Sequence, residues 1–225
     1  ALCGAFPWSA ERLDGGMGAA SYGVGGMITI TVPAADRNLL TIAELRAAAG
    51  VTGTAQDTSL ETLGLEVADS ISQACNIAIA GASLPTLRSE TIQQTERDVS
   101  ELSGISLARR PVVSISSVVV DGTTLNNSEY ECDLSSGILY RLVDDNRVLW
   151  CALKVVIVYV AGWATVPPDL KAAAKKLVTA LWSESTRNPN LKRERSEFGE
   201  LEYWVPPTTD PLLSAEIQDL LRPYR

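Results

Sequence analysis

The segment VVIVYVAGWATVPPDLKAAAKKLVTALWSES, residues 155–185, contains both kinds of secondary structure from which this chain is built. Its first seven residues, 155–161, are a continuous run of apolar and mostly β-branched side chains, which predicts a strand. The run does not alternate with polar residues, so we expect a strand that is buried on both faces. Pro167-Pro168 follows, and Pro168 suits the first turn of a helix because its missing N–H has no partner there in any case. Apolar residues at three- and four-residue steps then predict a helix from Asp169 to Ser185.

Upstream of this segment, between Leu87 and Ala161, many apolar residues follow the period of two that is typical of strands. Asp121-Gly122 predicts a tight turn. Residues 130–134 and 138–142 flank Ser135-Ser136-Gly137 as a hairpin, and Asp144–Arg147 predicts a second turn. We therefore expect an antiparallel sheet of about four to six strands in this region.

Helix signals lie on both sides of the predicted sheet. Thr41–Glu44 has the pattern of a capping box and opens a short helix that Gly50 ends. Thr58–Glu61 repeats that pattern before a longer amphipathic helix. Residues 214–221 predict a short terminal helix. The predicted fold class is α+β, a small helical bundle with an inserted antiparallel β-sheet and an extended C-terminal tail.

Composition along the chain predicts three parts. Residues 1–26 are rich in glycine with isolated aromatic residues and are expected to form an arm. Residues 27–195 form the α+β core. Residues 196–225 form a tail that is too apolar to be a solvated end, so we expect it to dock on a partner. Deleting residues 198–225 should then leave the core folded. The apolar residues in the first part of the tail are Phe198, Leu201, Tyr203 and Trp204.

The charge of the chain argues against general binding of nucleic acid. Its 225 residues carry a formal net charge of −8, whereas a nucleic-acid binder carries a basic face. The region 57–101 holds eight acidic residues against two arginines, while 187–195 holds four basic residues and one acid. These regions are either two oppositely charged surfaces or ordinary solvated faces. No segment has the ~20 apolar residues that span a membrane, and the start lacks a signal-peptide pattern, so we expect a protein made in the cytoplasm.

Several residue types that carry chemistry are missing or scattered. The chain has no histidine, and its four cysteines are far apart, which excludes a zinc site that could be read from spacing. A Cys132–Cys151 bridge is conceivable, and Cys75 is expected in the core. Tyr159, Trp163 and Trp182 could form a sugar-binding platform, but their spacing is more typical of core and interface aromatics.

Carboxylates could still serve as an acid–base pair or a calcium site. Glu129, Glu131 and Asp133 share one face of a predicted strand, which is typical of a solvated edge. Asp144-Asp145-Asn146 lacks the spacing of a calcium loop and is expected to form a turn. We therefore predict no catalytic, cofactor-binding or metal-binding residue and no enzyme.

Four segments together resemble the phage head–tail connector (adaptor) family, the ring proteins beneath the portal in long-tailed phages and gene-transfer agents. The first two are LARRPVVSISSV, residues 107–118, and YECDLSSGILYR, residues 130–141. The third is the strand-to-helix segment 155–174. The fourth comprises SEFGELEY, residues 196–203, with LLRPY at 220–224. The resemblance covers about residues 60–225, and the glycine-rich start departs from it.

This resemblance implies a structural subunit of the neck of a virion or phage-like particle, made in the bacterial cytoplasm. It would form a ring with itself, of twelve copies like the portal, between the portal protein and a stopper or tail-completion protein. DNA would pass through the lumen without sequence-specific binding, and no membrane would be involved. An acidic channel wall would let DNA slide, because binding depends on phosphate neutralisation. The residues expected to bind the portal are Arg193, Arg195, Phe198, Leu201, Tyr203, Trp204, Leu221 and Tyr224.

Two other functions remain open from the residues alone. The chain could be a soluble α+β interaction domain of another kind. It could also be a carboxylate-dependent hydrolase, which would have an acid with a pKa raised by burial beside a cleft.

Overall fold

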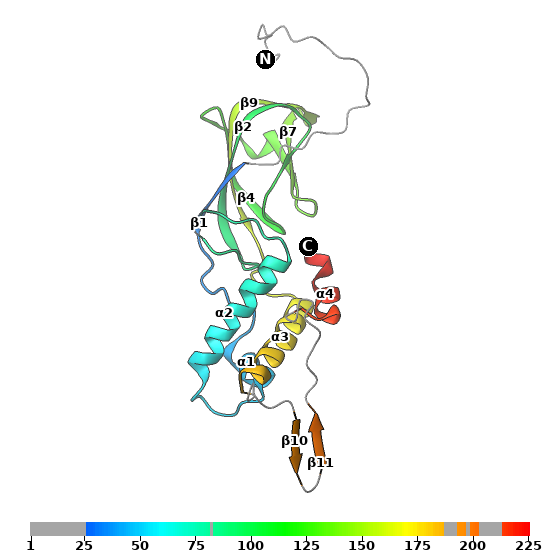
Figure 1. The fold of residues 1–225 in the computed structure, drawn as a ribbon. Coiled ribbons are helices and arrows are strands. Elements are labelled where there is room, and N and C mark those ends of the chain that lie inside the picture. Colours follow the sequence, from blue (N-terminus) through cyan, green and yellow to red (C-terminus); the bar gives the residue numbers. More distant parts are fainter. Residues whose placement is uncertain (1–25, 82, 187–192, 197–198, 203–212) are drawn as a thin grey trace, which may run out of the picture. The chain divides into compact units, whose positions relative to one another are not determined.

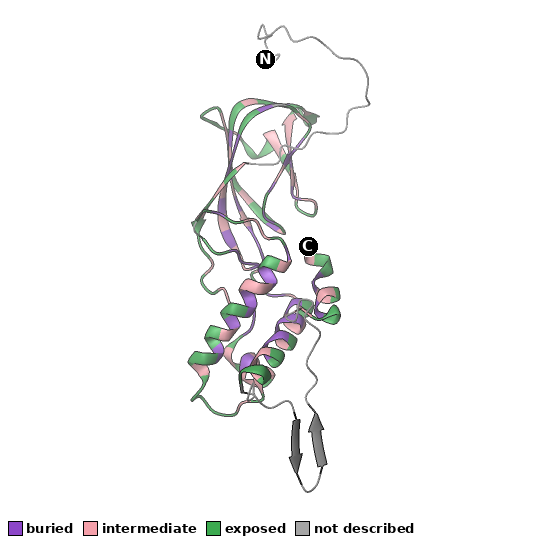
Figure 2. Ribbon diagram, in the orientation of Figure 1, coloured by how far each residue is buried: buried purple, intermediate pink, exposed green. Residues whose placement is uncertain are grey.

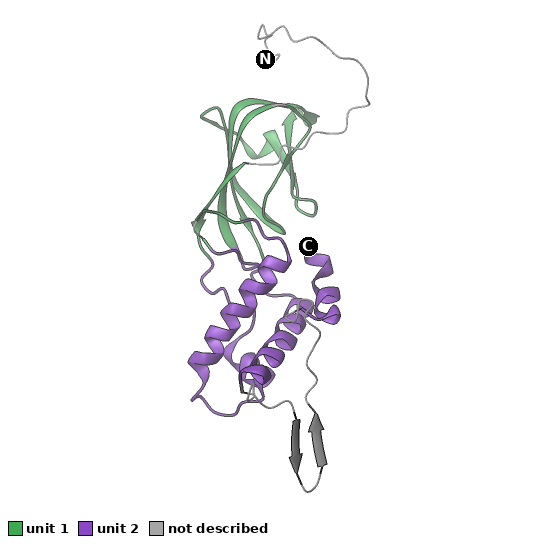
Figure 3. Cartoon of the chain, viewed as in Figure 1, with its two compact units in different colours: residues 1–33, 79–83, 90–162 green, residues 34–78, 84–89, 163–225 purple. Residues whose placement is uncertain are grey.

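The computed structural model describes residues 26–81, 83–186, 193–196, 199–202 and 213–225. It contains helices and antiparallel sheets, which confirms the predicted α+β class (Figure 1). Contacts divide the chain into two compact units that are interleaved in sequence (Figure 3). The sheet unit holds the described residues within 1–33, 79–83 and 90–162, and the helical unit holds those within 34–78, 84–89 and 163–225. These units differ from the three parts predicted from composition, and that three-part division stays a prediction.

The main element of the sheet unit is a five-stranded antiparallel sheet of order β1-β2-β9-β4-β5. Its strands are β1 (Met27–Val32), β2 (Glu90–Leu102), β9 (Trp150–Ala161), β4 (Val112–Val120) and β5 (Thr123–Thr124). The turn predicted at Asp121-Gly122 joins β4 to β5, and both of its residues have the positive φ that a tight hairpin requires. The longest strands, β2 and β9, lie at the centre, so the middle of the sheet is its most extensively paired part.

Strand β9 begins five residues before the predicted start, at Trp150 rather than Val155. From Val155 to Ala161, the odd-numbered residues are buried and the even-numbered valines are partly exposed. The expectation of burial on both faces is therefore wrong. Only one face of the sheet packs on the hydrophobic core, and the opposite face carries the remaining valines.

A second, smaller sheet completes this unit. It contains β3 (Ile105–Ser106), β7 (Ile138–Val143) and β6 (Tyr130–Asp133), and β8 (Asn146–Val148) pairs with β7. A single 3₁₀ turn, η1 (Asn127–Glu129), precedes β6. The predicted hairpin is confirmed as β6–β7, and Asp144 and Asp145, both at positive φ, form the turn between β7 and β8.

The helical unit contains α1 (Ile42–Ala49), α2 (Asp57–Ala74), α3 (Pro168–Thr186) and α4 (Ala215–Leu221), followed by the 3₁₀ turn η2 (Arg222–Tyr224). The capping box at Thr41 is confirmed, and Gly50 ends α1 in the left-handed conformation. The second predicted capping box is wrong, because α2 begins earlier, after Gln56, and has no side-chain cap. Asp57 accepts a hydrogen bond of 2.7 Å from Nε of Arg46, and this contact links the first residue of α2 to α1.

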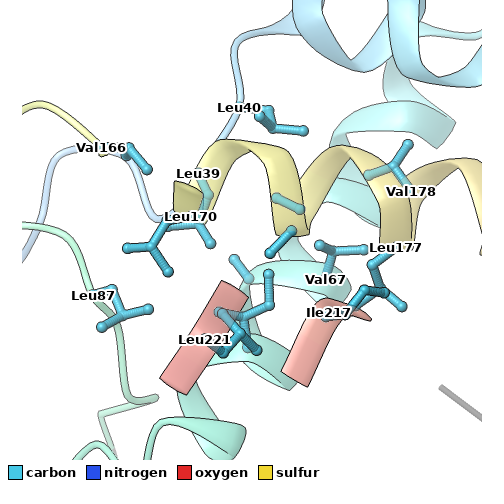
Figure 4. Close-up of a cluster of buried hydrophobic side chains, with 14 of the residues drawn as sticks. Leu39, Leu40, Val67, Leu87, Val166, Leu170, Leu177, Val178, Ile217 and Leu221 are labelled. Carbon is cyan, nitrogen blue, oxygen red and sulfur yellow. The ribbon is translucent and has the colours of Figure 1, made fainter. Parts of the chain in front are cut away.

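The core of the helical unit is one cluster of aliphatic side chains from all four helices and the segments between them (Figure 4). Leu60, Ile71, Leu170 and Leu177 are among its fully buried members. Each helix buries one side and exposes the other, which is clearest in α2 (Figure 2). Cys75 is a buried free thiol, as predicted, and burial raises its pKa to about 11.

The chain between α3 and α4 contains a short antiparallel hairpin. Its strands are β10 (Arg193–Ser196) and β11 (Gly199–Glu202), with Arg193 opposite Glu202 and Ser196 opposite Gly199. The hairpin crosses the predicted boundary between residues 195 and 196.

Candidate assembly surfaces

Most of the predicted portal-binding residues lie in or next to the β10–β11 hairpin. Arg193 and Arg195 belong to β10, and Leu201 belongs to β11. Arg195 and Glu200 are paired positions of the ladder. Phe198, Tyr203 and Trp204 lie outside the described residues.

The other two predicted residues, Leu221 and Tyr224, are part of the packing of the helical unit. Leu221 is fully buried in the aliphatic core. The ring of Tyr224 meets the ring of Trp163 edge to face, with centroids 6.1 Å apart and an interplanar angle of 78°. These contacts explain the apolar character of the chain end without a partner. Sequence reasoning did not detect this because the spacing of LLRPY does not show which surface the residues meet.

Helix α4 has a side-chain cap of its own and one ion pair with α3. The hydroxyl of Ser214 caps its first turn by accepting from the N–H of Ile217. Nζ of Lys176 lies 2.7 Å from a carboxylate oxygen of Glu216. The hairpin is therefore a loop between two helices that both belong to the helical core.

The lysines of α3 do not form an unpaired basic face. Glu44 on α1 lies 3.0 Å from Nζ of Lys171 and 3.5 Å from Nζ of Lys175. The hydrogen bond from the backbone N–H of Thr41 is the largest cause of a low pKa at Glu44, and the bond from Lys171 adds to it. Together they lower the pKa to about 2, although partial burial opposes the shift. This contact joins α1 to α3 and completes the cap of α1.

Helix α2 is the acidic element of the helical unit, since it holds four carboxylates and no basic residue. Two of them, Asp57 and Asp69, pair with Arg46 and Arg37. The other two, Glu61 and Glu66, are exposed. The arginine partners are distant in sequence, so the spacing of the acids did not reveal which ones are neutralised.

The strand carboxylates that were candidates for acid–base chemistry are held apart by separate partners. Glu129 pairs with Arg141, with N and O 3.4 Å apart, and Glu131 pairs with Arg147 at 2.8 Å. Asp133 accepts hydrogen bonds from Ser135 and Ser136, which lower its pKa. Each carboxylate therefore stabilises a local turn or strand pair.

A buried polar network lies inside the sheet unit, and the sequence did not predict it. Oε1 of Gln94 accepts from the N–H of Ala108 at 2.9 Å and from the hydroxyl of Tyr159 at 3.1 Å. Glu90 and Arg109 are both buried, with N and O 3.7 Å apart. The network joins β2 and β9 to residues 106–109, so its position supports a structural role.

The five-stranded sheet has an uncharged outer face. Its centre is formed by Val156, Val158 and Val160 of β9, which are partly exposed. Paired with them on β2 are Thr95, Gln93 and Thr91. The outward positions of β1 and β4 are occupied by Met, Thr, Ser and Val. Charged residues return only at the end of the sheet where Arg97 pairs with Lys154.

Both edges of this sheet are also uncharged. At one edge, β1 has the sequence MITITV and, among the described residues, pairs only with β2. At the other edge, β4 begins VVSISSV and pairs with β5 at Val119 and Val120, and the N–H of Leu125 donates to the carbonyl of Val118 at 2.9 Å. Three exposed hydrophobic side chains lie on these edges: Met27 and Val32, 65% and 57% exposed, and Val113, 51% exposed.

The described residues contain no group of three or more His, Cys, Asp or Glu that could hold a metal ion. They also contain no helix that is both long and apolar enough to cross a membrane.

Comparison with known proteins gives one family and one group of structures. A family model described as "Head completion protein" matches residues 38–225. No curated protein matches the chain.

Three similar solved structures come from gene transfer agent (GTA) particles. "Neck of empty GTA particle computed with C6 symmetry" has a TM-score of 0.54 and 16% identity, over 88% of this chain and 95% of that chain. "Neck of native GTA particle computed with C12 symmetry" has a TM-score of 0.53 and 15% identity, over 88% and 94%. "Virion of native gene transfer agent (GTA) particle" has a TM-score of 0.50 and 16% identity, over 88% and 95%. At these identities the similarity concerns the fold.

Proposed function

The chain belongs to the head completion protein family, and on this basis we propose that it is a structural head–tail adaptor in the neck of a phage or phage-like particle. The observation that carries the proposal is the extent of the family match. Residues 38–225 include most of the described residues and take in both units apart from strand β1, which precedes the match. The similar folds found in particle necks support the same assignment.

In this role the chain forms a ring with copies of itself, and we propose twelve copies. Two of the similar structures are described as necks computed with sixfold and twelvefold symmetry, which supports a cyclic arrangement. A closed ring needs two different contact surfaces on each subunit. The two open edges of the five-stranded sheet fit this requirement, because they are distinct and lie at opposite ends of one sheet.

The partners above and below the ring are the portal protein and a stopper or tail-completion protein. The β10–β11 hairpin is the proposed portal contact, through Arg193, Arg195, Leu201 and the adjacent residues Phe198, Tyr203 and Trp204. It suits this role because it is a loop inserted between α3 and α4, two helices that both contribute to the helical core. DNA passes through the ring without sequence-specific contact, and the net charge of −8 favours sliding over binding. The exposed Glu61 and Glu66 of α2 are candidates for the channel wall.

The role is structural rather than enzymatic. The strand carboxylates are engaged in separate local contacts, and the buried Glu90 lies beside Arg109. These arrangements stabilise the sheet unit and offer no paired acid and base.

The mass of the purified protein tests this function. Light scattering is measured on the chain alone, on a portal ring alone and on their mixture. We expect a complex with about one chain for each portal subunit, since adjacent rings of matched symmetry share contacts around the circle. A chain that stays monomeric and does not bind the portal would contradict the adaptor role.

A further inference from the structure

We propose that the ring is closed by the five-stranded sheet, with the β1 edge of one copy packing along the open β4 edge of the next. This inference rests on the proposed function, because it assigns the surfaces through which the ring forms. The occupant of each edge is a second copy of this chain.

The first argument is that β1 lacks most of the features that protect an edge strand. Natural proteins block open edges with charged side chains, proline, bulges or very short strands. Strand β1 is six residues long and contains no charge and no proline, and one bulge lies between Ile30 and Val32. Its two ends expose Met27 and Val32. Such a strand is a template for association with another chain.

The second argument is that the β4 edge matches it. The first seven residues of β4 are also uncharged, and β5 covers only the far end of the strand. Register shifts at Val113 and Ser116 mark two bulges, and both residues are exposed. The bulges interrupt the main-chain ladder at two positions, so the match to β1 rests on the uncharged composition and the exposed side chains of this edge.

The third argument concerns charge and identifies the partner. One fifth of the chain is charged, yet neither edge carries a charge, so their contact leaves no buried ion unpaired. DNA would need basic side chains on the edge, and a charged protein surface would lose its solvation against it. The best match for either edge within the described residues is the other edge.

The fourth argument is geometric. The edges belong to one sheet, with β2 and β9 between them, so they face in opposite directions. A contact between two unlike surfaces is heterologous and repeats from copy to copy until a ring closes. A contact of the β1 edge with itself would give only a dimer.

Two lysine substitutions test the inference, since an edge lysine is a natural block to strand association. Thr29→Lys blocks the β1 edge, and Ser116→Lys blocks the β4 edge. Ser103→Lys is the matched control, because Ser103 is exposed between β2 and β3 and lies on neither edge. Assembly is measured by native mass spectrometry and light scattering, with and without a portal ring. Far-ultraviolet circular dichroism verifies that each variant is folded.

Each edge variant alone should assemble into rings at least about tenfold less readily than the wild type, because its lysine would be buried without a partner. The control should assemble like the wild type. An equal mixture of the two edge variants should form a dimer and stop there. That dimer joins the intact β1 edge of the Ser116→Lys chain to the intact β4 edge of the Thr29→Lys chain.

Wild-type ring formation by either edge variant would overturn the inference while leaving the adaptor function intact. A wild-type chain that forms no ring, alone or on the portal, would instead contradict the proposed function.

Amide hydrogen exchange on the wild type gives a measurement without substitutions. The N–H groups of residues 27–32 that do not bond to β2 should exchange at least about tenfold more slowly in the ring than in the free chain. Unchanged exchange at these positions would also overturn the inference.

Discussion

Individual side chains in this protein are best understood through the partners that they meet from distant parts of the chain. Trp163 lies two residues after the end of the central strand, and its backbone N–H donates to the carbonyl of Leu87 at 2.8 Å. Its ring packs against the helical core and against Tyr224. Trp163 is the residue at which the chain re-enters the helical unit, and its contact with Tyr224 links this point to the chain end.

Replacing Trp163 by alanine should lower the free energy of unfolding by about 3–5 kcal/mol, because the change removes a large aromatic side chain from the packed helical unit. The measurement is urea unfolding followed by circular dichroism at 222 nm. Arg222→Ala, at an exposed position next to the same aromatic pair, is the control and should change stability by less than about 0.5 kcal/mol. A loss below about 1 kcal/mol for Trp163→Ala would place this ring in an interface instead.

Glu44 should make the stability of the helical unit depend on pH. Its pKa is lowered from 4.5 to about 2, so the folded state binds a proton less readily than the unfolded state. The resulting stabilisation is present above pH 4.5 and is lost as the pH falls through about 2. Glu44→Gln keeps a side chain that can still complete the capping box but removes the charge. The thermal midpoint of the wild type should exceed that of the variant at pH 7, and the difference should shrink towards pH 2. Glu216→Gln, on an exposed pair, is the control, and an equal gap for Glu44→Gln at both pH values would contradict the assignment.

Among the secondary-structure elements, α4 and the β10–β11 hairpin have different roles although both lie in the predicted tail. Helix α4 places Ile217 and Leu221 in the helical core. Deleting residues 198–225 should therefore destabilise the core, unlike the expectation from the sequence. Only the hairpin is now expected to be dispensable for folding. Removing two buried aliphatic side chains would open a cavity, and cavities of this size cost several kcal/mol, about 2–5 for each leucine or isoleucine.

The hairpin alone should be dispensable for folding and required for portal binding. Residues 193–202 are replaced by a Gly-Ser linker of the same length, which leaves α3 and α4 intact. We expect an unchanged thermal midpoint and a loss of binding to the portal ring, measured by co-sedimentation. The double variant Arg193→Glu and Arg195→Glu tests whether portal binding depends on the two basic charges. A second linker with the same Gly and Ser residues in another order is the control. Normal portal binding by the linker variant would remove the hairpin from the proposed interface.

Considered as a whole molecule, the protein is two units with separate hydrophobic cores. The core of the helical unit and the core of the sheet unit share no residue. The chain leaves the helical unit after Ser89 and returns at Trp163, and the N–H of Ser89 donates to the carbonyl of Trp163 at 3.3 Å. The long insertion therefore begins and ends at neighbouring points.

Excision of residues 90–162 should leave a helical unit that folds by itself. Residues 34–89 and 163–225 are joined by a linker of three glycines, which is enough because the two ends are hydrogen-bonded neighbours. We expect a helical circular dichroism spectrum and a cooperative thermal transition. Cys75, a thiol buried in this core, should remain protected from a thiol reagent until the transition. A spectrum without cooperative melting, or immediate labelling of Cys75, would show that the helical core depends on the sheet unit.

The local features of the fold were predictable from the residues because short-range chemistry determines them. The β-branched run that becomes β9, the capping box at Thr41, the left-handed glycine at residue 50 and the positive-φ turns are examples. The order of these elements was also enough to indicate an inserted sheet and a family. Each local feature depends on residues within a few positions of one another, whereas the family resemblance rests on four segments between residues 107 and 224.

Only the tertiary structure decided which surfaces are covered. Val156 and Val158 on one face of β9 are as apolar as Val155 and Ile157 on the other, and burial differs because the core lies on one side alone. Leu201 and Leu221 are both leucines near the end of the chain, and nothing in the local sequence shows that Leu221 lies in the helical core. The partners of Glu44 and of Asp69 lie 127 and 32 residues away along the chain. Burial and pairing depend on contacts between distant segments, and no local pattern of residue types specifies those contacts.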